Sequence, residues 1–154
     1  MSAGPLVFCS PDDAIAAVGR DLGQTDWLLI DQERVNLFAD ATGDHQWIHV
    51  DVERANREMG GTIAHGFLTL SLVNYFLPML FRAEGLKSGI NYGCGKVRFP
   101  APVKTGKRVR ASAVLQSAEP TGPGAVQTVV VMTISAEGQG KPACVAESIG
   151  RYFF

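Results

Sequence analysis

The stretch from residue 39 to residue 72, ADATGDHQWIHVDVERANREMGGTIAHGFLTLSL, contains polar residues suited to chemistry and leads into a long apolar segment. Its first half places a carboxylate, Asp44, and an imidazole, His49, five residues apart, after a glycine that argues against one continuous helix. In its second half, Gly66 is expected at or near the start of a helix. Free N–H groups at a helix start attract negative charge. The stretch therefore combines an acid–base pair with a backbone anion site, which suits chemistry beside a carbonyl group.

The apolar segment spans residues 63–81 and is hydrophobic almost all round, a pattern typical of a helix enclosed on most sides. Pro78 is expected to kink or end this helix. After it the pattern changes, and strands are expected over residues 88–99, 107–118, 125–138 and 142–153. A helix followed by short antiparallel neighbours predicts the α+β class, with an antiparallel β-sheet wrapped around one long central helix. Since no repeat or linker interrupts residues 1–154, a single domain is expected.

Several shorter elements are expected before the apolar segment. Ser10 is expected to cap a first helix, and residues 25–30 are expected to form a short strand. Asp31 is expected to cap a second helix over residues 32–41. Residues 51–60 are typical of a short exposed helix that ends at glycine.

The composition excludes several classes of protein. With 46% hydrophobic and 19% charged residues, the sequence is that of an ordinary globular protein, neither disordered nor fibrous. The net charge of −1 gives no general attraction to nucleic acid or to an anionic membrane, so neither is expected as a partner. The three cysteines form no CxxC pair, which argues against a disulfide framework or a zinc cage. We expect a cytoplasmic protein without a signal peptide or a membrane span.

Two runs in the central stretch, FADATGDHQWIHVD at residues 38–51 and GGTIAHGFLTLSL at residues 60–72, resemble the hydratase motif of MaoC-like dehydratases. These are the (R)-specific enoyl-CoA hydratases of the hot-dog superfamily. Residues 91–113, NYGCGKVRFPAPVKTGKRVRASA, are similar to the strand pair that follows the central helix in that family. The resemblance covers most of the chain from about Trp27 onward. Gln46-Trp47 stands where other members carry Asn-Pro before the histidine, a departure that keeps the acid–base spacing but bears on pocket shape.

The resemblance implies a hot-dog fold and the hydration of a trans-2-enoyl-CoA thioester. Asp44 and His49 would together hold the reacting water, and the N–H of Gly66 would receive the charge that develops on the thioester oxygen. Asn74 occupies the position of a polar residue that contacts the catalytic carboxylate; without that role it would be an ordinary hydrogen-bonded residue of a helix. The family uses no metal, and no cofactor is expected. The resemblance also implies a homodimer with the site at the junction of two subunits.

Other interpretations of the same residues stay open. Asp44 alone would be an ordinary turn residue. His45 and His49, with His65 or Asp51, would suggest a metal site if this segment formed a regular helix. The same oxyanion donor would serve a hot-dog thioesterase, and a hot-dog subunit that binds acyl thioesters without turnover is a third alternative. A subset of the basic residues of the strand region would meet coenzyme A phosphates: Lys96, Arg98, Lys104, Lys107, Arg108 and Arg110.

Overall fold

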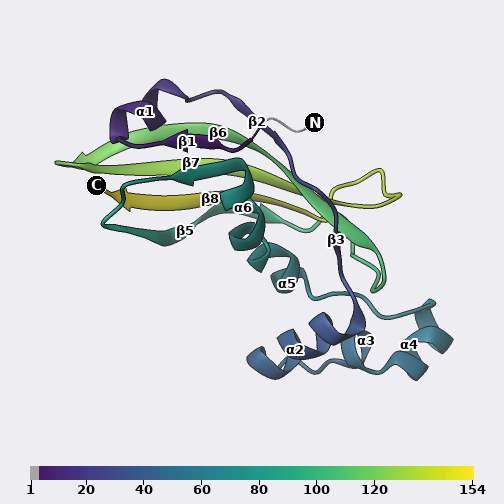
Figure 1. Cartoon of the computed structure of the whole chain (residues 1–154). Helices are drawn as coiled ribbons and strands as arrows, with labels where there is room; N and C mark the ends of the chain where they lie inside the picture. Colours follow the sequence, from purple (N-terminus) through teal and green to yellow (C-terminus); the bar gives the residue numbers. More distant parts are fainter. Residues whose placement is uncertain (1–3) are drawn as a thin grey trace.

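An antiparallel sheet is the largest element of the computed structural model, which describes residues 4–154 (Figure 1). The four long strands are β5 (Ser88–Arg98), β6 (Arg108–Gly122), β7 (Ala125–Ala136) and β8 (Cys144–Phe153). Two short strands, β2 (Asp21–Gln24) and β3 (Leu28–Leu29), both pair with β6. The order across the sheet is β2-β6-β7-β8-β5, so all four strands expected after the apolar segment are confirmed.

Neighbours along the chain are not all neighbours in the sheet. Strands β6, β7 and β8 pair in sequence order, as expected, but β5 pairs with β8 and lies far from β6. The expectation of consecutive antiparallel neighbours is therefore wrong for β5 and β6. The connection between β5 and β6 contains Pro100 and Pro102, and its Lys104 forms a β-bridge with Ile63. It does not turn back as a hairpin but runs from the β5 edge of the sheet to β6, near the opposite edge.

The central helix consists of two consecutive segments, α5 (Gly66–Ser71) and α6 (Val73–Leu80). Leu72 joins them and keeps right-handed helical angles, with φ −68° and ψ −10°. The expectation that Pro78 ends the helix is wrong, because the helix continues through that proline to Leu80; the alternative, a kink at Pro78, stays a prediction. The expected start at Gly66 is confirmed, since Gly66 is the first residue of α5.

One face of the central helix packs on the sheet, and the opposite face is open. Leu68, Phe76 and Leu80 are buried, with Phe76 fully enclosed. Phe67 and Tyr75, in contrast, are 68% and 46% exposed. The prediction of a helix enclosed on most sides is thus wrong for the single chain, because the sheet covers the helix from one side only.

Three short helices form a helical arm, residues 32–59, that lies apart from the sheet (Figure 1). They are α2 (Gln32–Thr42), α3 (Trp47–Val50) and α4 (Val52–Met59). The predicted cap of α2 is confirmed, because the Asp31 carboxylate accepts the N–H of Arg34 at 2.9 Å. The helix expected over residues 51–60 is confirmed as α4, which ends at Gly60 in the left-handed conformation.

The N-terminal part of the described chain contributes one helix, α1 (Pro11–Ala16), and the short strands β1 (Leu6–Phe8), β2 and β3. In α1 the predicted cap is confirmed, because the Ser10 hydroxyl accepts the N–H of Asp13 at 3.2 Å. A parallel pair of short strands, β1 and β4 (Phe81–Ala83), was not predicted. The strand expected over residues 25–30 is reduced to β3, since Trp27 leaves the ladder and its ring contacts the guanidinium of Arg110 at 4.4 Å.

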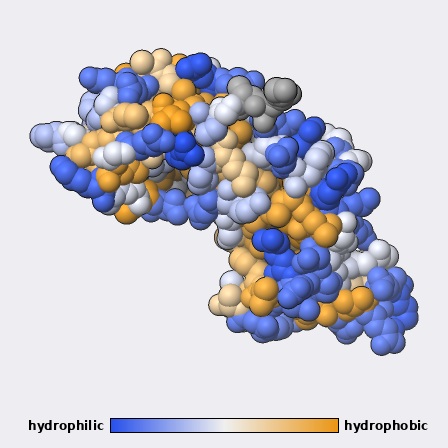
Figure 2. All heavy atoms as spheres, viewed as in Figure 1, coloured by the Kyte–Doolittle hydropathy of each residue, from blue (hydrophilic) through white to orange (hydrophobic). Residues whose placement is uncertain are grey.

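The space-filling view shows a narrow region between the body of the sheet and the helical arm, with hydrophobic residues gathered along it (Figure 2). Phe67 and Phe99 contribute to the exposed apolar surface, and their ring centroids are 5.9 Å apart. Among residues 4–154, no helix has both the length and the apolar character that a membrane crossing requires.

Candidate active site

His49 lies in the single turn of α3, and its side chain points back toward the start of the central helix. Its Nδ1 is 2.7 Å from the carbonyl oxygen of Ile63. Because a carbonyl only accepts, Nδ1 carries the proton, and Nε2 is the acceptor of the neutral ring. His49 is 6% exposed. The ring is therefore held in one orientation and one tautomer, with Nε2 available for chemistry.

Asp44 follows Gly43, whose left-handed conformation (φ 79°) ends α2. The Asp44 side chain is exposed in the single chain, and its Oδ1 accepts only a long bond, 3.4 Å, from the N–H of Gln46. One ligand-type atom from each of Asp44, His49 and His65 lies within 4.8 Å of the other two. The structure thus brings the predicted acid–base pair together and adds His65 to it.

The two histidines of this cluster do not form a favourable metal site. The rings of His49 and His65 are stacked, with centroids 3.8 Å apart and planes 23° from parallel. A histidine ligand binds a metal along the lone pair in its ring plane, at about 2.0–2.1 Å for zinc. Nearly parallel rings direct those lone pairs side by side instead of to one point. His45, the other histidine considered for a metal, is turned away and pairs with Asp40 at 2.8 Å.

The Gly66 backbone borders the same pocket as the His49 ring. This pocket has a volume of about 320 Å³ and also includes Thr69 and Phe99 in its lining. Within residues 4–154 the N–H of Gly66 makes no hydrogen bond, as expected for the first position of a helix. A Cβ at Gly66 would lie 3.2 Å from the Phe99 ring, so glycine allows that ring to pack closely on the helix start.

Asn74 lies elsewhere in the single chain. Its Oδ1 accepts the side-chain N–H of Asn91 on β5 at 3.0 Å, and it lines a different pocket, of about 170 Å³, between the central helix and the sheet. Among the hydrogen bonds of residues 4–154, none joins Asn74 to Asp44. The contact with the catalytic carboxylate that the resemblance implies is therefore not made within one protomer.

Sequence reasoning missed a polar network that supports His49. The Gln32 side chain donates to the His49 carbonyl at 2.7 Å and accepts the Thr62 hydroxyl at 2.6 Å. Thr62 also lies 2.8 Å from the hydroxyl of Thr105. The network joins α2, α3 and two loops that are distant in sequence, so no local pattern predicts it. The only signal in the sequence was the polar character of Gln32, Thr62 and Thr105.

The basic residues of the strand region differ in whether their side chains form ion pairs or hydrogen bonds within the chain. Arg108 is paired with Glu137, which raises the pKa of the guanidinium through hydrogen bonding and lowers that of the carboxyl group. Lys104 donates to the carbonyl of Met59. Lys96, Lys107 and Arg98 have no ion pair in the described part of the chain.

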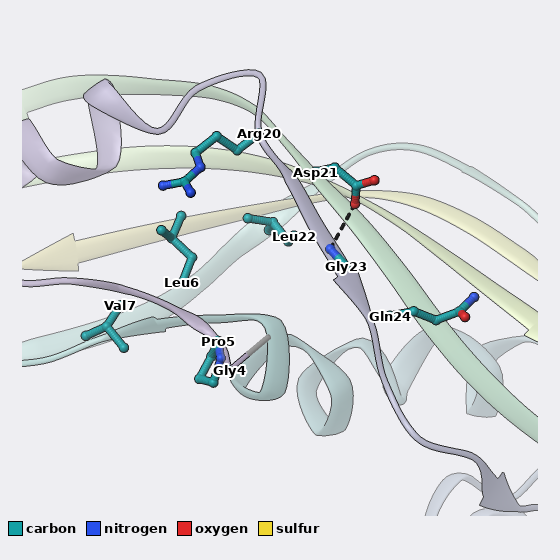
Figure 3. A pocket seen from close by; sticks show the side chains of 9 residues that line it. All are labelled: Gly4, Pro5, Leu6, Val7, Arg20, Asp21, Leu22, Gly23 and Gln24. Carbon is teal, nitrogen blue, oxygen red and sulfur yellow. Dashed lines mark hydrogen bonds between the residues drawn. The ribbon is translucent and has the colours of Figure 1, made fainter. Parts of the chain in front are cut away.

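A slightly larger pocket, of about 360 Å³, lies between β1 and the edge strand β2 (Figure 3). Its charged residues are Arg20 and Asp21, and the Asp21 carboxylate is occupied by the N–H of Gly23 at 2.8 Å. Gln24, two glycines and apolar residues line the rest. Because this pocket contains no acid–base pair, we place the candidate active site at the pocket of His49 and Gly66.

The sequence matches a family described as "MaoC like domain" over residues 13–137. One curated relative, 3-hydroxyacyl-thioester dehydratase Z of Mycobacterium tuberculosis, is 57% identical over 146 residues, which are 94% of this chain and 97% of that protein. The structure is similar to that of a MaoC-like dehydratase from Rhodospirillum rubrum, with a TM-score of 0.71 and 19% identity over 89% of this chain and 92% of the other. It is also similar to an (R)-hydratase from A. caviae involved in PHA biosynthesis, with a TM-score of 0.70 and 23% identity over 86% and 94% of the two chains.

Proposed function

This chain belongs to the MaoC-like dehydratase family, and we propose that it is an (R)-specific enoyl-CoA hydratase. It has the hot-dog fold, an antiparallel sheet with a central helix, and it is a hydro-lyase. The proposed reaction adds water to trans-2-enoyl-CoA and gives (R)-3-hydroxyacyl-CoA. The observation that carries the proposal is the convergence of Asp44 and His49 within 4.8 Å, beside the unbonded N–H of Gly66.

In the proposed mechanism, the Asp44 carboxylate and Nε2 of His49 hold one water molecule. Asp44, or the pair, takes a proton from this water as its oxygen attacks C3 of the substrate, and the same site then delivers a proton to C2. Attack transfers charge to the thioester oxygen, and the N–H of Gly66 would receive that charge. Loss of one such donor costs roughly 3 to 4 kcal/mol of transition-state stabilisation.

One incubation distinguishes hydration from the two alternatives. With crotonyl-CoA, a hydratase removes absorbance of the conjugated enoyl band without releasing free thiol. A thioesterase releases thiol, and a binding subunit changes neither signal. Thiol release as the only reaction, or no turnover by a folded protein, would contradict the proposal. A series of longer enoyl-CoA substrates would then report the depth of the acyl pocket.

We further propose a homodimer, in which the open face of the central helix and the free edge of β5 are covered by a second copy. The large apolar side chains exposed on these elements and on the segment after β5 are Phe67, Tyr75, Met79, Ile90, Tyr92 and Phe99. Strand β5 has a partner on one side only, and unpaired sheet edges are ready sites for pairing with another chain. A homodimer would also explain why Asn74 does not meet Asp44 within one protomer. A solution mass of one chain in light scattering at micromolar concentration would contradict this.

The proposed function also includes coenzyme A as the carrier of the acyl group and a cytoplasmic location. Coenzyme A phosphates would be met by basic residues without ion pairs, such as Lys96, Lys107 and Arg98. A cytoplasmic location would suit Cys9, Cys94 and Cys144, which are all unpaired thiols. Comparison of crotonyl-CoA with crotonyl-pantetheine would test whether the phosphates contribute to binding.

A further inference from the structure

We infer that His65 is a positioning residue that holds both Asp44 and His49 in their working geometry, an inference that rests on the proposed hydratase function. His65 immediately precedes Gly66, so it belongs to the body of the molecule, whereas Asp44 and His49 belong to the helical arm. It is 3% exposed. No other side chain of the described residues contacts both members of the acid–base pair through such short interactions.

The first contact is a hydrogen bond across the two halves of the site. Nε2 of His65 lies 3.0 Å from the backbone carbonyl oxygen of Asp44. Because that oxygen only accepts, Nε2 must carry the proton. In the other two hydrogen bonds of Asp44, its backbone N–H donates to the Thr42 hydroxyl and its carboxylate accepts the N–H of Gln46; both are 3.4 Å long and local in sequence. The bond from His65 is therefore the one that fixes the Asp44 loop relative to the helix start.

The second contact is the stack between the rings of His65 and His49, with centroids 3.8 Å apart. Phe38 of α2 also contacts the His65 ring, at 4.9 Å between centroids. One hydrogen bond, from Nδ1–H of His49 to Ile63, does not by itself prevent rotation of the His49 ring about that bond. The stacked ring of His65 limits this rotation. One imidazole thus restrains the backbone of the acid and the ring of the base together.

The remaining nitrogen of His65 shows why a histidine is needed. Nδ1 is buried and has no hydrogen-bond partner within residues 4–154. A buried acceptor without a partner is unfavourable, and an aromatic hydrocarbon ring of similar size would fill the space without this cost. The feature that such a ring lacks is the Nε2–H donor to Asp44.

Two variants separate the bond from the stack. His65→Phe keeps an aromatic ring but removes the donor, and His65→Gln keeps an N–H at a similar reach but removes the ring. Since a displacement of about 1 Å at a reacting centre costs roughly a hundredfold in rate, we expect His65→Phe to lower kcat for crotonyl-CoA by about that factor with KM nearly unchanged. His65→Gln should lose less. Wild-type kcat in folded His65→Phe, or a loss confined to KM, would overturn the inference.

A measurement on the unaltered protein decides the matter if the variants fail to fold. The chain has three histidines, so a ¹⁵N-histidine sample gives three sets of ring signals, and the sets missing from His45→Ala and from His49→Gln assign the remaining set to His65. We expect the Nε2–H tautomer for His65 and the Nδ1–H tautomer for His49. An Nδ1–H tautomer at His65 would overturn the inference. Absence of wild-type hydration would instead refute the proposed function, and the tautomer result would stand independently.

Discussion

The sheet and the helical arm differ in the interactions that stabilise each of them. In β6 and β7, every second side chain is buried over most of the strand, and Leu115, Met132 and Ile134 are fully enclosed. In the arm, the buried residues of α2, α3 and α4 are Val35, Ala39, His49 and Ala55. Burial of large apolar side chains therefore stabilises the sheet, while the arm has little of this contribution.

Apart from Val35 and Phe38, which pack with the main hydrophobic core, polar contacts hold the arm against the body. They include the bonds from His49 to Ile63, from His65 to Asp44, and from Lys104 to Met59. A hydrogen bond contributes only about 0.5–1.5 kcal/mol of net stability, but it requires one geometry. This difference indicates that contacts of the arm mainly position the candidate site residues, whereas contacts of the sheet mainly stabilise the fold. Substitutions in the two regions should accordingly affect different measurements.

The largest effect is expected from the acid–base pair in and beside the arm. Asp44→Asn and His49→Gln should each lower the hydration rate by roughly two to four powers of ten, the usual contribution of general acid–base catalysis. The thermal midpoint of Asp44→Asn should stay near that of the wild type, because the Asp44 side chain is exposed, whereas His49→Gln should also lower the midpoint, because the buried His49 ring and its bond to Ile63 help to hold the arm. Asp40→Asn is the matched control, since it alters an exposed carboxylate near the end of α2 that is not part of the proposed pair. Near-normal turnover by Asp44→Asn would contradict the mechanism.

A somewhat smaller effect is expected at Gly66, which starts the central helix and lines the same pocket as His49 of the arm. Gly66→Pro removes the N–H, and the helix start tolerates proline because His65 already has the extended angles φ −59° and ψ 138°. Gly66→Ala is the matched control: both variants place a Cβ against Phe99, but alanine keeps the donor. We expect the proline variant to turn over crotonyl-CoA roughly two to three powers of ten more slowly than wild type. Equal rates for the two variants would show that the carbonyl is held elsewhere.

The sheet should respond in stability instead of rate. Ile134→Ala removes a fully buried side chain from β7 and should lower the free energy of unfolding by about 2–5 kcal/mol in urea titrations. Ile134→Val should lose only about 0.5–1.5 kcal/mol. At a temperature where both variants are folded, kcat should be close to wild type. A loss of kcat as large as that of Asp44→Asn would break the division between the two regions.

The smallest effect is expected at His45, which lies in the same motif as His49 but faces solvent. Its hydrogen bond to the Asp40 carboxylate raises the pKa of His45 above the ordinary value. A raised folded-state pKa gives stability that is present below the unfolded pKa and lost as pH rises through the folded pKa. His45→Ala should therefore lower the thermal midpoint slightly at pH 5.5 but not at pH 8, with kcat unchanged. A large loss of kcat would give His45 a role that its position does not support.

Local patterns predicted individual elements well. The caps at Ser10 and Asp31, the helix start at Gly66 and the four long strands each depend on a few adjacent residues. The spacing between Asp44 and His49, together with the family resemblance, predicted an acid–base pair; the two side chains do lie close together, and their catalytic role stays a prediction. The two-stranded pairing of β1 with β4 escaped prediction because three-residue strands carry too little periodicity.

Contacts between distant segments were not predictable in the same way. The bond from His65 to Asp44 spans 21 residues, and the bond from Thr62 to Gln32 spans 30. The contact of Asn74 with Asn91, in place of one with Asp44, depends on how β5 lies beside the central helix. Such pairings follow from the path of the connections, which no short stretch of sequence specifies.

By itself, therefore, the sequence determined the α+β class, the caps and the strands, and it named Asp44 and His49 as the candidate acid–base pair, a role that stays a prediction. Only the tertiary structure decided the order of the sheet, the open face of the central helix and the partners of Asn74, His65 and Gln32. The physical reason is range. Periodicity and capping act over one or two turns of backbone, whereas the geometry of the site depends on polar bonds between segments that meet only after the chain has folded.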